Sequence, residues 1–306
     1  MRIIFAGTPA NAATTLEALL ASGHEVVGVL TRMDAPTGRS GTITESPVAA
    51  VAEHLGIELH KTNVLNQHSI DWMASLAPDL GVIVAFGSIL RSDVLSIPRR
   101  GWINLHYSAL PKYPGASPVQ QAVIDGASQT GVTVFELDEG IDSGPVLAQS
   151  ECQISPQDTA GSLLERLTAV GSDLLLATLR NFDELSRQKS PQVVGGSQIV
   201  TKKITRQQAR IDFGFTAEAI VNLVRGMNPE PVAWFEHDSQ PVRVLEATRT
   251  DVDKLPTGTA QLIGKILVVG CSDSSVVLSV VQPAGKQPMS GADWFRGLRK
   301  DSVLLT

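Results

Sequence analysis

Short, nearly continuous runs of apolar residues, separated by segments of helical periodicity, open this chain of 306 residues. Helical spacing of apolar residues marks Ala12–Ala21 and Pro47–Leu55, and Ser46 and Pro47 suit the start of the second helix. The apolar runs between and after them lie at Arg2–Ala6, Glu25–Leu30, Leu80–Phe86 and Gly101–Leu105. Strands without polar alternation are typical of a parallel sheet that helices cover on both faces. We therefore expect an α/β fold with a Rossmann-like, mostly parallel sheet.

The pattern changes after His106. Gly131–Leu137 and Pro145–Gln153 are rich in β-forming residues, and Thr159–Asp183 carries leucines at helical spacing. Lys189–Thr201 is polar and contains proline and glycine, a composition typical of a linker.

Beyond this stretch, a short helix is expected at Ala217–Val224. Short β-like runs then follow at Val232–Glu236, Val242–Ala247, Lys265–Val269 and Val276–Val281. They predict a small β-barrel of the oligonucleotide-binding (OB-like) type, with a sandwich as the alternative. We accordingly expect an N-terminal domain at 1–189, a linker at 190–203 and a C-terminal domain at 204–306.

Composition excludes several classes of protein. Hydrophobic residues make up 43% of the chain and charged residues 18%, which argues against disorder. The two cysteines, Cys152 and Cys271, are far apart and belong to no Cys/His cluster, so neither a disulfide framework nor a zinc site is expected. The chain begins on a strand pattern without a targeting segment, and no run approaches the ~18 apolar residues that span a bilayer. We expect a cytoplasmic protein without a membrane partner.

Charge is distributed unevenly along the chain, whose formal net charge is -6. Residues 1–199 carry 12 Lys and Arg against 20 Asp and Glu, whereas residues 200–306 carry 13 against 11. A mildly basic C-terminal part is compatible with a polyanion that touches mainly this part. A slightly basic but otherwise ordinary domain is the alternative.

A turn between strand and helix, Phe5–Pro9, is the first candidate site. Gly7 permits a tight turn, and the N–H groups at the helix start can receive a polar or anionic ligand. The spacing of a dinucleotide-binding loop is missing, and no acidic residue ends the second strand near Leu30. The turn therefore disfavours NAD binding, and a purely structural turn stays open.

The end of the Gly101–Leu105 strand carries the stronger candidate. Asn104 and His106 alternate and so share one face at the carboxyl end of a strand, the edge where open α/β sheets bind ligands. A compact loop with two prolines, Tyr107–Gly115, follows them and suits a flat ligand. Farther on, the loop Leu137–Pro145 holds three carboxylates, one of which can partner the histidine. A structural histidine and a solvated turn are the alternatives.

These residues resemble a known family. Asn104-x-His106-x-Ser108-x-Leu110-Pro111 and the block Asp138–Gly144 resemble the two signature blocks of the folate-dependent formyltransferases. Other segments resemble the members of that family that act on initiator tRNA charged with methionine: Phe5–Pro9, Pro36-x-Gly38-Arg39, Ser46–Val48, Ala209–Asp212 and Asn228–Trp234. The resemblance covers almost the whole chain.

The resemblance implies transfer of a formyl group from 10-formyltetrahydrofolate to the methionine amino group of initiator methionyl-tRNA, which serves translation initiation. It implies the catalytic residues Asn104, His106 and Asp142. It implies a folate site lined by Ser108, Ala109, Leu110, Pro111, Phe86, Gly87, Ile89 and Leu90. Arg39 is implied to reach the acceptor end of the tRNA, with the C-terminal domain as a tRNA platform. No metal is implied, and we expect a monomer.

The trio suits this chemistry, because formyl transfer to an amine passes through a tetrahedral oxyanion that needs a hydrogen-bond donor. The attacking ammonium must also lose a proton to a positioned base or a carboxylate-linked relay. The segment Asp34–Glu45 departs from the family, since Ser40-Gly41-Thr42 stands where lysines are usual. It is expected to be a loop that is mobile when no tRNA is bound. A formyltransferase for another amine, such as an amino sugar nucleotide, and a non-catalytic tRNA-binding protein are the alternatives.

Overall fold

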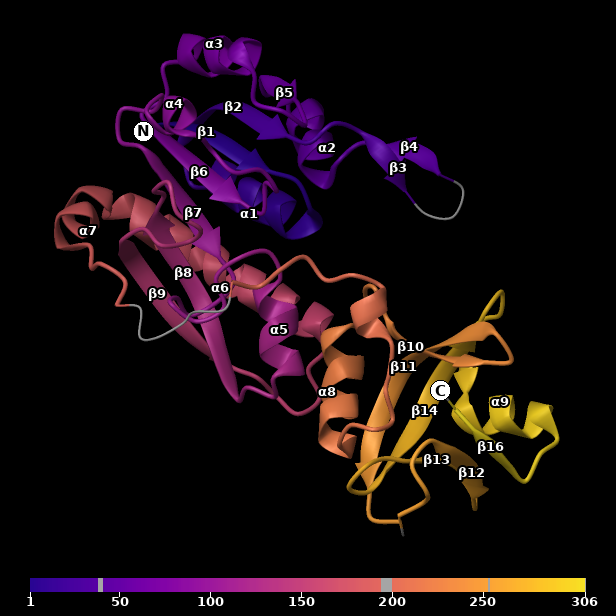
Figure 1. Ribbon diagram of the computed structural model, residues 1–306. Coiled ribbons are helices and arrows are strands. Elements are labelled where there is room, and N and C mark those ends of the chain that lie inside the picture. The colour runs from indigo at the N-terminus through magenta and orange to yellow at the C-terminus, as the bar shows by residue number, and fades with distance from the viewer. Residues whose placement is uncertain (38–40, 194–199, 253, 306) are drawn as a thin grey trace. The chain divides into compact units, whose positions relative to one another are not determined.

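A computed structural model describes residues 1–37, 41–193, 200–252 and 254–305 (Figure 1), so Arg39 lies outside the described residues. The chain forms two compact units, each assembled from segments that are separate in sequence. Unit 1 comprises Met1–Pro118, Thr130–Gln153 and Leu164–Thr201. Unit 2 comprises Val119–Gln129, Ile154–Leu163 and Lys202–Thr306.

A seven-stranded sheet with the order β5-β2-β1-β6-β7-β8-β9 forms the centre of unit 1. The strands are β1 (Arg2–Gly7), β2 (Glu25–Thr31), β5 (Leu59–Lys61), β6 (Leu80–Val84), β7 (Trp102–His106), β8 (Gln129–Glu136) and β9 (Val146–Gln153). The pairs from β5 to β7 are parallel, whereas β7 and β8 are antiparallel. The expected Rossmann-like, mostly parallel sheet is therefore confirmed. Because β6 and β7 run the same way, the loops that follow them leave from one edge.

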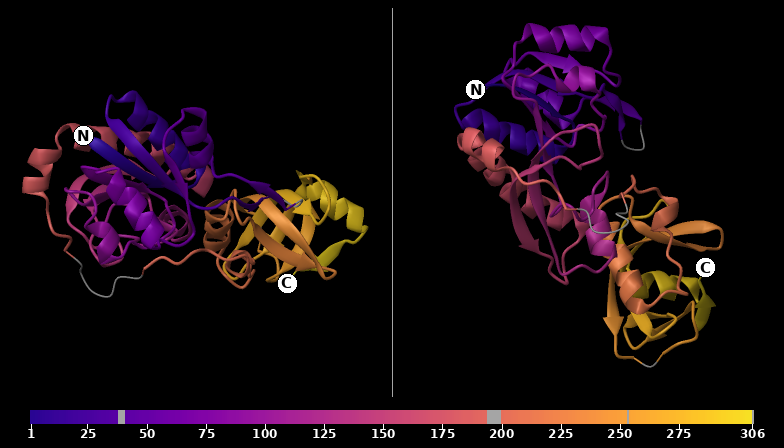
Figure 2. Two further views of the ribbon diagram at one scale, coloured as in Figure 1. Left: turned by 90° about the horizontal axis from the view of Figure 1, so that it is seen from above. Right: turned by 60° about the vertical axis from the view of Figure 1, so that its left-hand side comes forward.

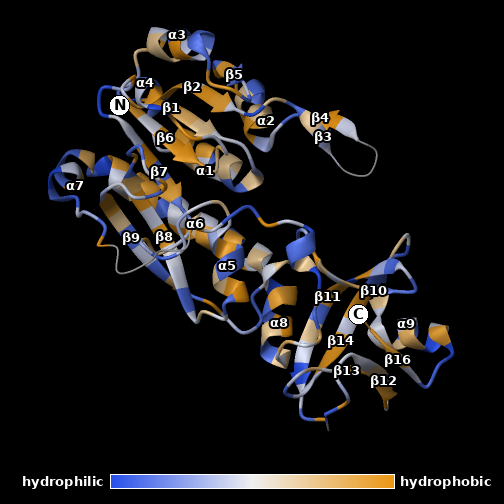
Figure 3. Ribbon diagram, in the orientation of Figure 1, coloured by the Kyte–Doolittle hydropathy of each residue, from blue (hydrophilic) through white to orange (hydrophobic). Residues whose placement is uncertain are grey.

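The helices that precede residue 189 are α1 (Ala10–Ala21), α2 (Pro47–His54), α3 (Gln67–Ser75), α4 (Ser92–Leu95), α5 (Pro118–Ile124), α6 (Ala160–Arg180) and α7 (Phe182–Gln188). Ser46 caps α2 as expected, since its hydroxyl accepts from the Ala49 N–H at 3.0 Å. The hydrophobic colouring of the central strands (Figure 3) matches their burial, because every residue of β6 is buried. Apolar strands buried on both faces explain why the sequence lacks alternation here.

A short hairpin occupies part of the segment that is expected from the sequence to be a mobile loop. Strands β3 (Ala35–Thr37) and β4 (Thr42–Thr44) pair antiparallel, and the hydroxyls of Thr37 and Thr44 lie 2.6 Å apart. All six residues are exposed, so no apolar face marks these strands in the sequence. The pairing of β3 with β4 was not predicted, because cross-strand pairing of β-branched residues, rather than burial, forms the hairpin.

Unit 2 contains an antiparallel sheet with the order β10-β11-β14-β13-β12-β16, and Figure 2 shows its strands (orange to yellow) as a curved sheet. Its elements are η1 (Gln207–Ala209), α8 (Ala217–Gly226), β10 (Ala233–His237), β11 (Gln240–Thr250), β12 (Thr259–Ile263), β13 (Ile266–Gly270), β14 (Ser275–Pro283), β15 (Met289–Ser290), α9 (Gly291–Leu298) and β16 (Ser302–Leu304). Register shifts in β11 around Glu246 bend that strand. The fold class predicted for this half, a small barrel-like β domain, is confirmed.

Two segments that precede the linker-like stretch, Val119–Gln129 and Ile154–Leu163, belong to unit 2. Arg225 of α8 donates from Nε to the carbonyl of Asp158 at 2.8 Å and from Nη2 to that of Ser155 at 3.0 Å. Ile124 packs against the hydrophobic core of unit 2. The domain boundaries at residues 189 and 204 stay a prediction, because they divide the sequence by composition rather than by contacts. Within the described ranges, every helix is too short or too polar to cross a lipid bilayer.

Candidate functional site

Strand β7 presents Asn104 and His106 on one face of the sheet. The His106 side chain is buried, whereas Asn104 is partly exposed. The Asn104 amide makes no hydrogen bond to the part of the chain that the structure describes. Its N–H groups are therefore available to an oxygen atom of a ligand at the carboxyl end of β7.

Asp142 reaches this strand end from the loop between β8 and β9. Its Oδ2 lies 3.5 Å from Nδ1 of His106 and accepts a hydrogen bond of 2.7 Å from the Gly115 N–H. The Asp142 backbone has a φ of 51°, in the left-handed region that non-glycine residues rarely adopt. The structure thus brings His106 and Asp142 together, in a backbone conformation that other contacts must hold.

The hydrogen bond made by the second ring nitrogen of His106, Nε2, determines which nitrogen of the neutral ring carries the hydrogen. Nε2 lies 3.0 Å from the carbonyl oxygen of Tyr113. A carbonyl only accepts, so Nε2 carries the hydrogen of this bond and Nδ1 faces Asp142. This tautomer leaves Nδ1 as the nitrogen that can take up and release a proton beside a carboxylate.

The stretch Ser108–Lys112 of the loop after β7 contains the four expected folate-lining residues, Ser108 to Pro111, and it bonds to itself, to Thr133 of β8 and to Gln149 of β9. The Ser108 hydroxyl donates to the Lys112 carbonyl at 2.6 Å. The Thr133 hydroxyl donates to the Ser108 carbonyl at 2.7 Å and accepts from the Leu110 N–H at 3.1 Å. Ser108 and Leu110 are buried, and Ala109 and Pro111 are partly exposed. These residues can form a rigid wall, and the bonded groups are not free donors or acceptors.

The loop after β6 contains the other expected folate residues, which divide into two kinds. Phe86 and Leu90 are buried in the hydrophobic core of unit 1, whereas Gly87 and Ile89 are exposed. Arg32 at the end of β2 holds this loop, since its Nη1 donates to the Gly87 carbonyl at 2.9 Å and to the Ser88 hydroxyl at 3.0 Å. The buried pair anchors the loop, and the exposed pair can meet a ligand.

The turn Phe5–Pro9 supports the same loop. The Thr8 hydroxyl donates to the Phe86 carbonyl at 3.1 Å. A Cβ at Gly7 would lie 2.8 Å from the Ala12 side chain and 2.9 Å from the Val84 carbonyl. Gly7 is therefore required by close packing between β1, α1 and β6, which is the structural alternative for this turn.

Tyr107 directly follows His106 but offers no base. Burial raises the pKa of its phenol above the ordinary value of 10.0, so the group is neutral at physiological pH. No group of three or more His, Cys, Asp or Glu side chains within the described ranges is arranged to hold a metal ion.

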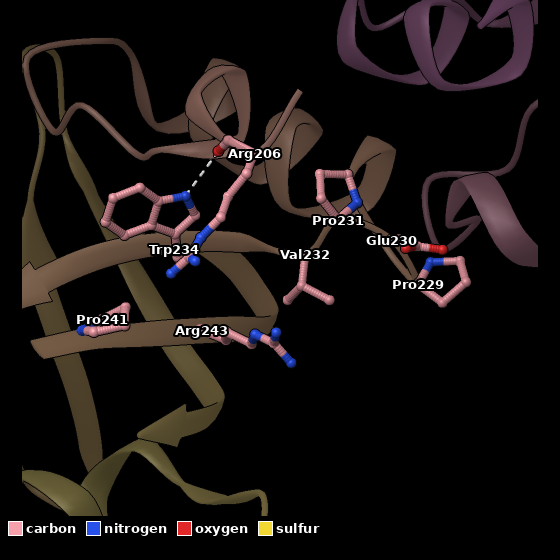
Figure 4. Close-up of a pocket in the computed structure, with 8 residues that line it drawn as sticks. All are labelled: Arg206, Pro229, Glu230, Pro231, Val232, Trp234, Pro241 and Arg243. Atoms are coloured by element: carbon pink, nitrogen blue, oxygen red, sulfur yellow. Dashed lines mark hydrogen bonds between the residues drawn. The ribbon is translucent and has the colours of Figure 1, made fainter. Parts of the chain in front are cut away.

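A second feature, which we call the arginine–tryptophan pocket, lies within unit 2 (Figure 4). It has a volume of about 440 Å³ and is lined by Arg206, Pro229, Glu230, Pro231, Val232, Trp234, Pro241 and Arg243. Trp234 Nε1 donates to the Arg206 carbonyl at 2.9 Å, and the Arg206 guanidinium lies 5.3 Å from the centre of the indole ring. Arg210 approaches the same ring at 5.6 Å, and Arg243 is the cross-strand neighbour of Trp234.

The three arginines are exposed, and none forms an ion pair with another described residue. Cations stacked on an aromatic face beside a concave surface suit a nucleic-acid backbone with an adjacent base. The sequence marks Trp234 and Arg210 only through the blocks Asn228–Trp234 and Ala209–Asp212, which resemble the family, and it marks neither Arg206 nor Arg243 individually. The excess of cations after residue 199 was the one signal for them.

Known proteins share this architecture over nearly the whole chain. Residues 1–179 match the family described as Formyl transferase, and residues 203–299 match the one described as Formyl transferase, C-terminal domain. A curated relative from Paenarthrobacter aurescens (strain TC1), named methionyl-tRNA formyltransferase, is 44% identical over 299 residues, which are 97% of this chain and 97% of that protein.

Two solved structures share the fold at low sequence identity. HypX from Aquifex aeolicus, in complex with tetrahydrofolic acid, has a TM-score of 0.65 at 16% identity, covering 98% of this chain, which spans only 48% of HypX. An N-formyltransferase from Helicobacter canadensis, in complex with folinic acid and dTDP-3-aminofucose, has a TM-score of 0.68 at 19% identity and covers 92% of this chain and 99% of its own. The two family matches and the identity to the curated relative show that this chain belongs to the formyl transferase family.

Proposed function

We propose that the protein transfers the formyl group of 10-formyltetrahydrofolate to the amino group of methionine on initiator methionyl-tRNA. The observation that carries the chemistry is the contact between His106 and Asp142, 3.5 Å apart, on the strand end that also carries the Asn104 amide, which no described residue bonds. The tRNA substrate is supported by the name of the relative that is 44% identical over 97% of each chain.

Asn104 acts on the oxygen of the formyl group. The methionine amine attacks the formyl carbon, and the carbonyl oxygen becomes an oxyanion as the new C–N bond forms. The Asn104 amide, which has no partner among the described residues, donates to this oxygen. A donor in place before the reaction lowers the barrier because it need not reorganise as charge develops.

His106 and Asp142 manage the proton. The attacking ammonium must lose a proton before or during attack, and Nδ1 of His106 is the nitrogen free to take it. The Asp142 carboxylate stabilises the resulting imidazolium at 3.5 Å. The bond between the formyl carbon and N10 then breaks, and tetrahydrofolate leaves as its nitrogen recovers a proton.

The folate donor is proposed to lie against the loops that follow β6 and β7. Ala109 and Pro111 offer partly exposed surface, and Gly87 and Ile89 offer exposed surface. The bonded backbone of Ser108 and Leu110 keeps this wall rigid, so little conformational entropy is lost when a flat ring binds.

The RNA is proposed to contact unit 2 through the arginine–tryptophan pocket. Arg206 and Arg243 supply exposed charge for phosphates, and the indole of Trp234 offers a stacking surface. Arg39, on the segment between β3 and β4, is proposed to contact the acceptor end, although it lies outside the described residues.

Turnover assays with 10-formyltetrahydrofolate test the proposal. We expect formylation of methionine-charged initiator tRNA and none of uncharged tRNA or of an amino sugar nucleotide. Preferential formylation of the sugar would assign the site to that alternative substrate. Tight binding of the tRNA without any turnover would support the non-catalytic alternative.

A further inference from the structure

The segment after α7 contacts the candidate catalytic loops at both of its described ends, although its composition is that of a linker. Gln192 lies just before the residues outside the described ranges, and Thr201 lies after them. Both belong to unit 1. Each one bonds to backbone that in turn holds His106 or Asp142.

Gln192 bonds to the backbone at Asp142 and two residues after it. Its Nε2 donates to the Asp142 carbonyl at 2.8 Å and to the Gly144 carbonyl at 2.8 Å. One amide nitrogen therefore fixes two carbonyls that are two residues apart. This contact restrains the backbone at Asp142, whose left-handed conformation is unfavourable on its own.

Thr201 holds the backbone that receives the Asp142 side chain. Its N–H and its hydroxyl donate to the Pro114 carbonyl at 2.7 and 2.9 Å, and its carbonyl accepts from the Ala116 N–H at 2.9 Å. The enclosed residue, Gly115, donates to Asp142. A Cβ at Gly115 would lie 2.3 Å from the Thr201 carbonyl, so the two backbones are in direct contact.

The contacts of Gln192 and Thr201 both constrain the position of the Asp142 carboxylate. Gln192 sets the peptide from which the Asp142 side chain projects, and Thr201 sets the N–H group that its Oδ2 accepts. The carbonyl that orients His106 belongs to Tyr113, directly before Pro114. A shift at either end would therefore change the distance between His106 and Asp142.

We propose that Gln192 and Thr201 are positioning residues for formyl transfer, which act by fixing Asp142 against His106. The inference rests on the proposed function, since it takes Asp142 as part of the catalytic group. The competing explanation is that the segment only docks onto the sheet, in which case loss of either contact would lower stability without changing turnover.

Matched substitutions in the full chain separate the two explanations. Gln192→Met keeps the length of the side chain and removes its donor. Gln188→Met is the control, since among the described residues the Gln188 side chain bonds only to Glu184, on the surface of α7. Thr201→Val removes the hydroxyl and Thr201→Ser keeps it. Thr178→Val is the control for loss of a buried hydroxyl, because Thr178 bonds to Leu174 within α6.

We expect Gln192→Met to lower kcat roughly 10- to 100-fold, since small misplacements of a catalytic group have effects of this size. Thr201→Val is expected to lower kcat about 10-fold and Thr201→Ser by less than about threefold, with KM for both substrates nearly unchanged. Both controls should retain the kcat of the parent chain. Unchanged kcat in Gln192→Met and Thr201→Val would overturn the proposal, as would equal losses in Thr201→Val and Thr201→Ser.

A double-mutant cycle shows whether Gln192 acts through Asp142. Asp142→Asn should lower kcat strongly, and Gln192→Met should add little in that background, since the group it positions has already lost its charge. Additive losses would place the action of Gln192 elsewhere and overturn the inference. An Asp142→Asn variant with full activity would instead refute the proposed catalytic group. If Gln192→Met fails to fold, the comparison of Thr201→Val with Thr201→Ser decides.

Discussion

The candidate catalytic loops of unit 1 and the arginine–tryptophan pocket of unit 2 hold their charged groups in opposite ways. His106 is buried, and backbone groups of Tyr113 and Gly115 fix both its ring and the facing Asp142. Arg206 and Arg243 are exposed, and the nearest described partner of the Arg206 guanidinium is an indole face at 5.3 Å.

The difference fits the roles proposed for the two regions: chemistry at the candidate catalytic loops and binding at the arginine–tryptophan pocket. Buried groups with fixed directions interact strongly, because little water screens them and they need not reorganise. Exposed cations contribute charge over a wide range of geometries, and dissolved ions screen them. Substitutions in the candidate catalytic loops should therefore change kcat equally at low and high salt. Substitutions in the arginine–tryptophan pocket should instead change how strongly kcat/KM for charged tRNA depends on salt.

Substitution of Asn104 is expected to have the largest effect. Asn104→Ala removes the proposed oxyanion donor and should lower kcat roughly 10²- to 10³-fold. The loss should be the same at about 50 and about 200 mM salt, because the donor acts inside the site. Steady-state assays with charged initiator tRNA and the formyl donor measure both quantities.

Asn181→Ala is the matched control for Asn104→Ala, since the exposed Asn181 side-chain amide bonds, within the described ranges, only to the Ala177 carbonyl. The control should keep the parent kcat, and folate binding should be similar in both variants. Full turnover in Asn104→Ala would remove this residue from the catalytic group.

Loss of the pocket arginines is expected to have the next largest effect. The double variant Arg206→Ala/Arg243→Ala should lower kcat/KM for charged tRNA and leave kcat nearly unchanged. For each lost phosphate contact, the slope of log K against log salt should become shallower by roughly 0.7 to 0.9. Measurements of kcat/KM over a series of salt concentrations give this slope.

Arg249→Ala/Arg296→Ala is the control for this pair, because it removes two charges from the same unit at arginines that pair with Glu218 and Asp293. It should alter the slope less than the pocket variant. Equal slopes in the two double variants would mean that net charge, rather than the pocket, determines tRNA binding.

The sequence predicted much of the fold because local patterns carry the information. Continuous apolar runs identified β1, β2, β6 and β7, and Ser46 with Pro47 marked the start of α2. The hairpin β3–β4 was not predicted, because its residues are exposed and its stability depends on pairing between strands. Helix α9 was not predicted either, because its eight residues include Gly291 and Gly297, and glycine disfavours helices.

The candidate site, too, could be predicted only where a local sequence pattern carries the information. Alternation along one strand placed Asn104 and His106 on a common face, and this needed only local geometry. The contacts of Gln192 with Asp142 and of Thr201 with Pro114 join residues 50 and 87 positions apart. No local pattern encodes such contacts, so the sequence showed only a polar, linker-like segment there.

Substitution of Arg32 tests the folate loop and should have a moderate effect. Arg32→Met removes two hydrogen bonds to the loop after β6, at Gly87 and Ser88. The loop should become less ordered, and KM for the formyl donor should rise about threefold to tenfold, as expected for the loss of hydrogen bonds of ordinary strength. Arg91→Met, whose guanidinium pairs with Asp93, is the control, and an equal KM in the two variants would exclude a role for Arg32.

The smallest effect is expected at Lys61, which joins the two ends of the β3–β4 segment. Its ammonium lies 2.8 Å from Glu53, 3.1 Å from Asp34 and 3.8 Å from Glu45. The hydrogen bond to Glu53 raises the pKa of Lys61 above its ordinary value of 10.5, burial opposes this change, and Asp34 adds to it. A raised pKa in the folded state means that the ion pairs contribute fully below pH 10.5 and lose their contribution as the pH rises through the folded value.

Lys61→Met should therefore lower the free energy of unfolding by no more than roughly 1 kcal/mol at neutral pH, as for partly exposed ion pairs elsewhere. Urea unfolding at about pH 8 and about pH 11 measures the difference from the parent chain, which should shrink at the higher pH as the parent loses its ammonium. A difference that is equal at both pH values would assign the effect to packing of the side chain rather than to its charge. Because these pairs lie at the surface, the difference should also decrease at high salt, unlike the loss of kcat expected for Asn104→Ala.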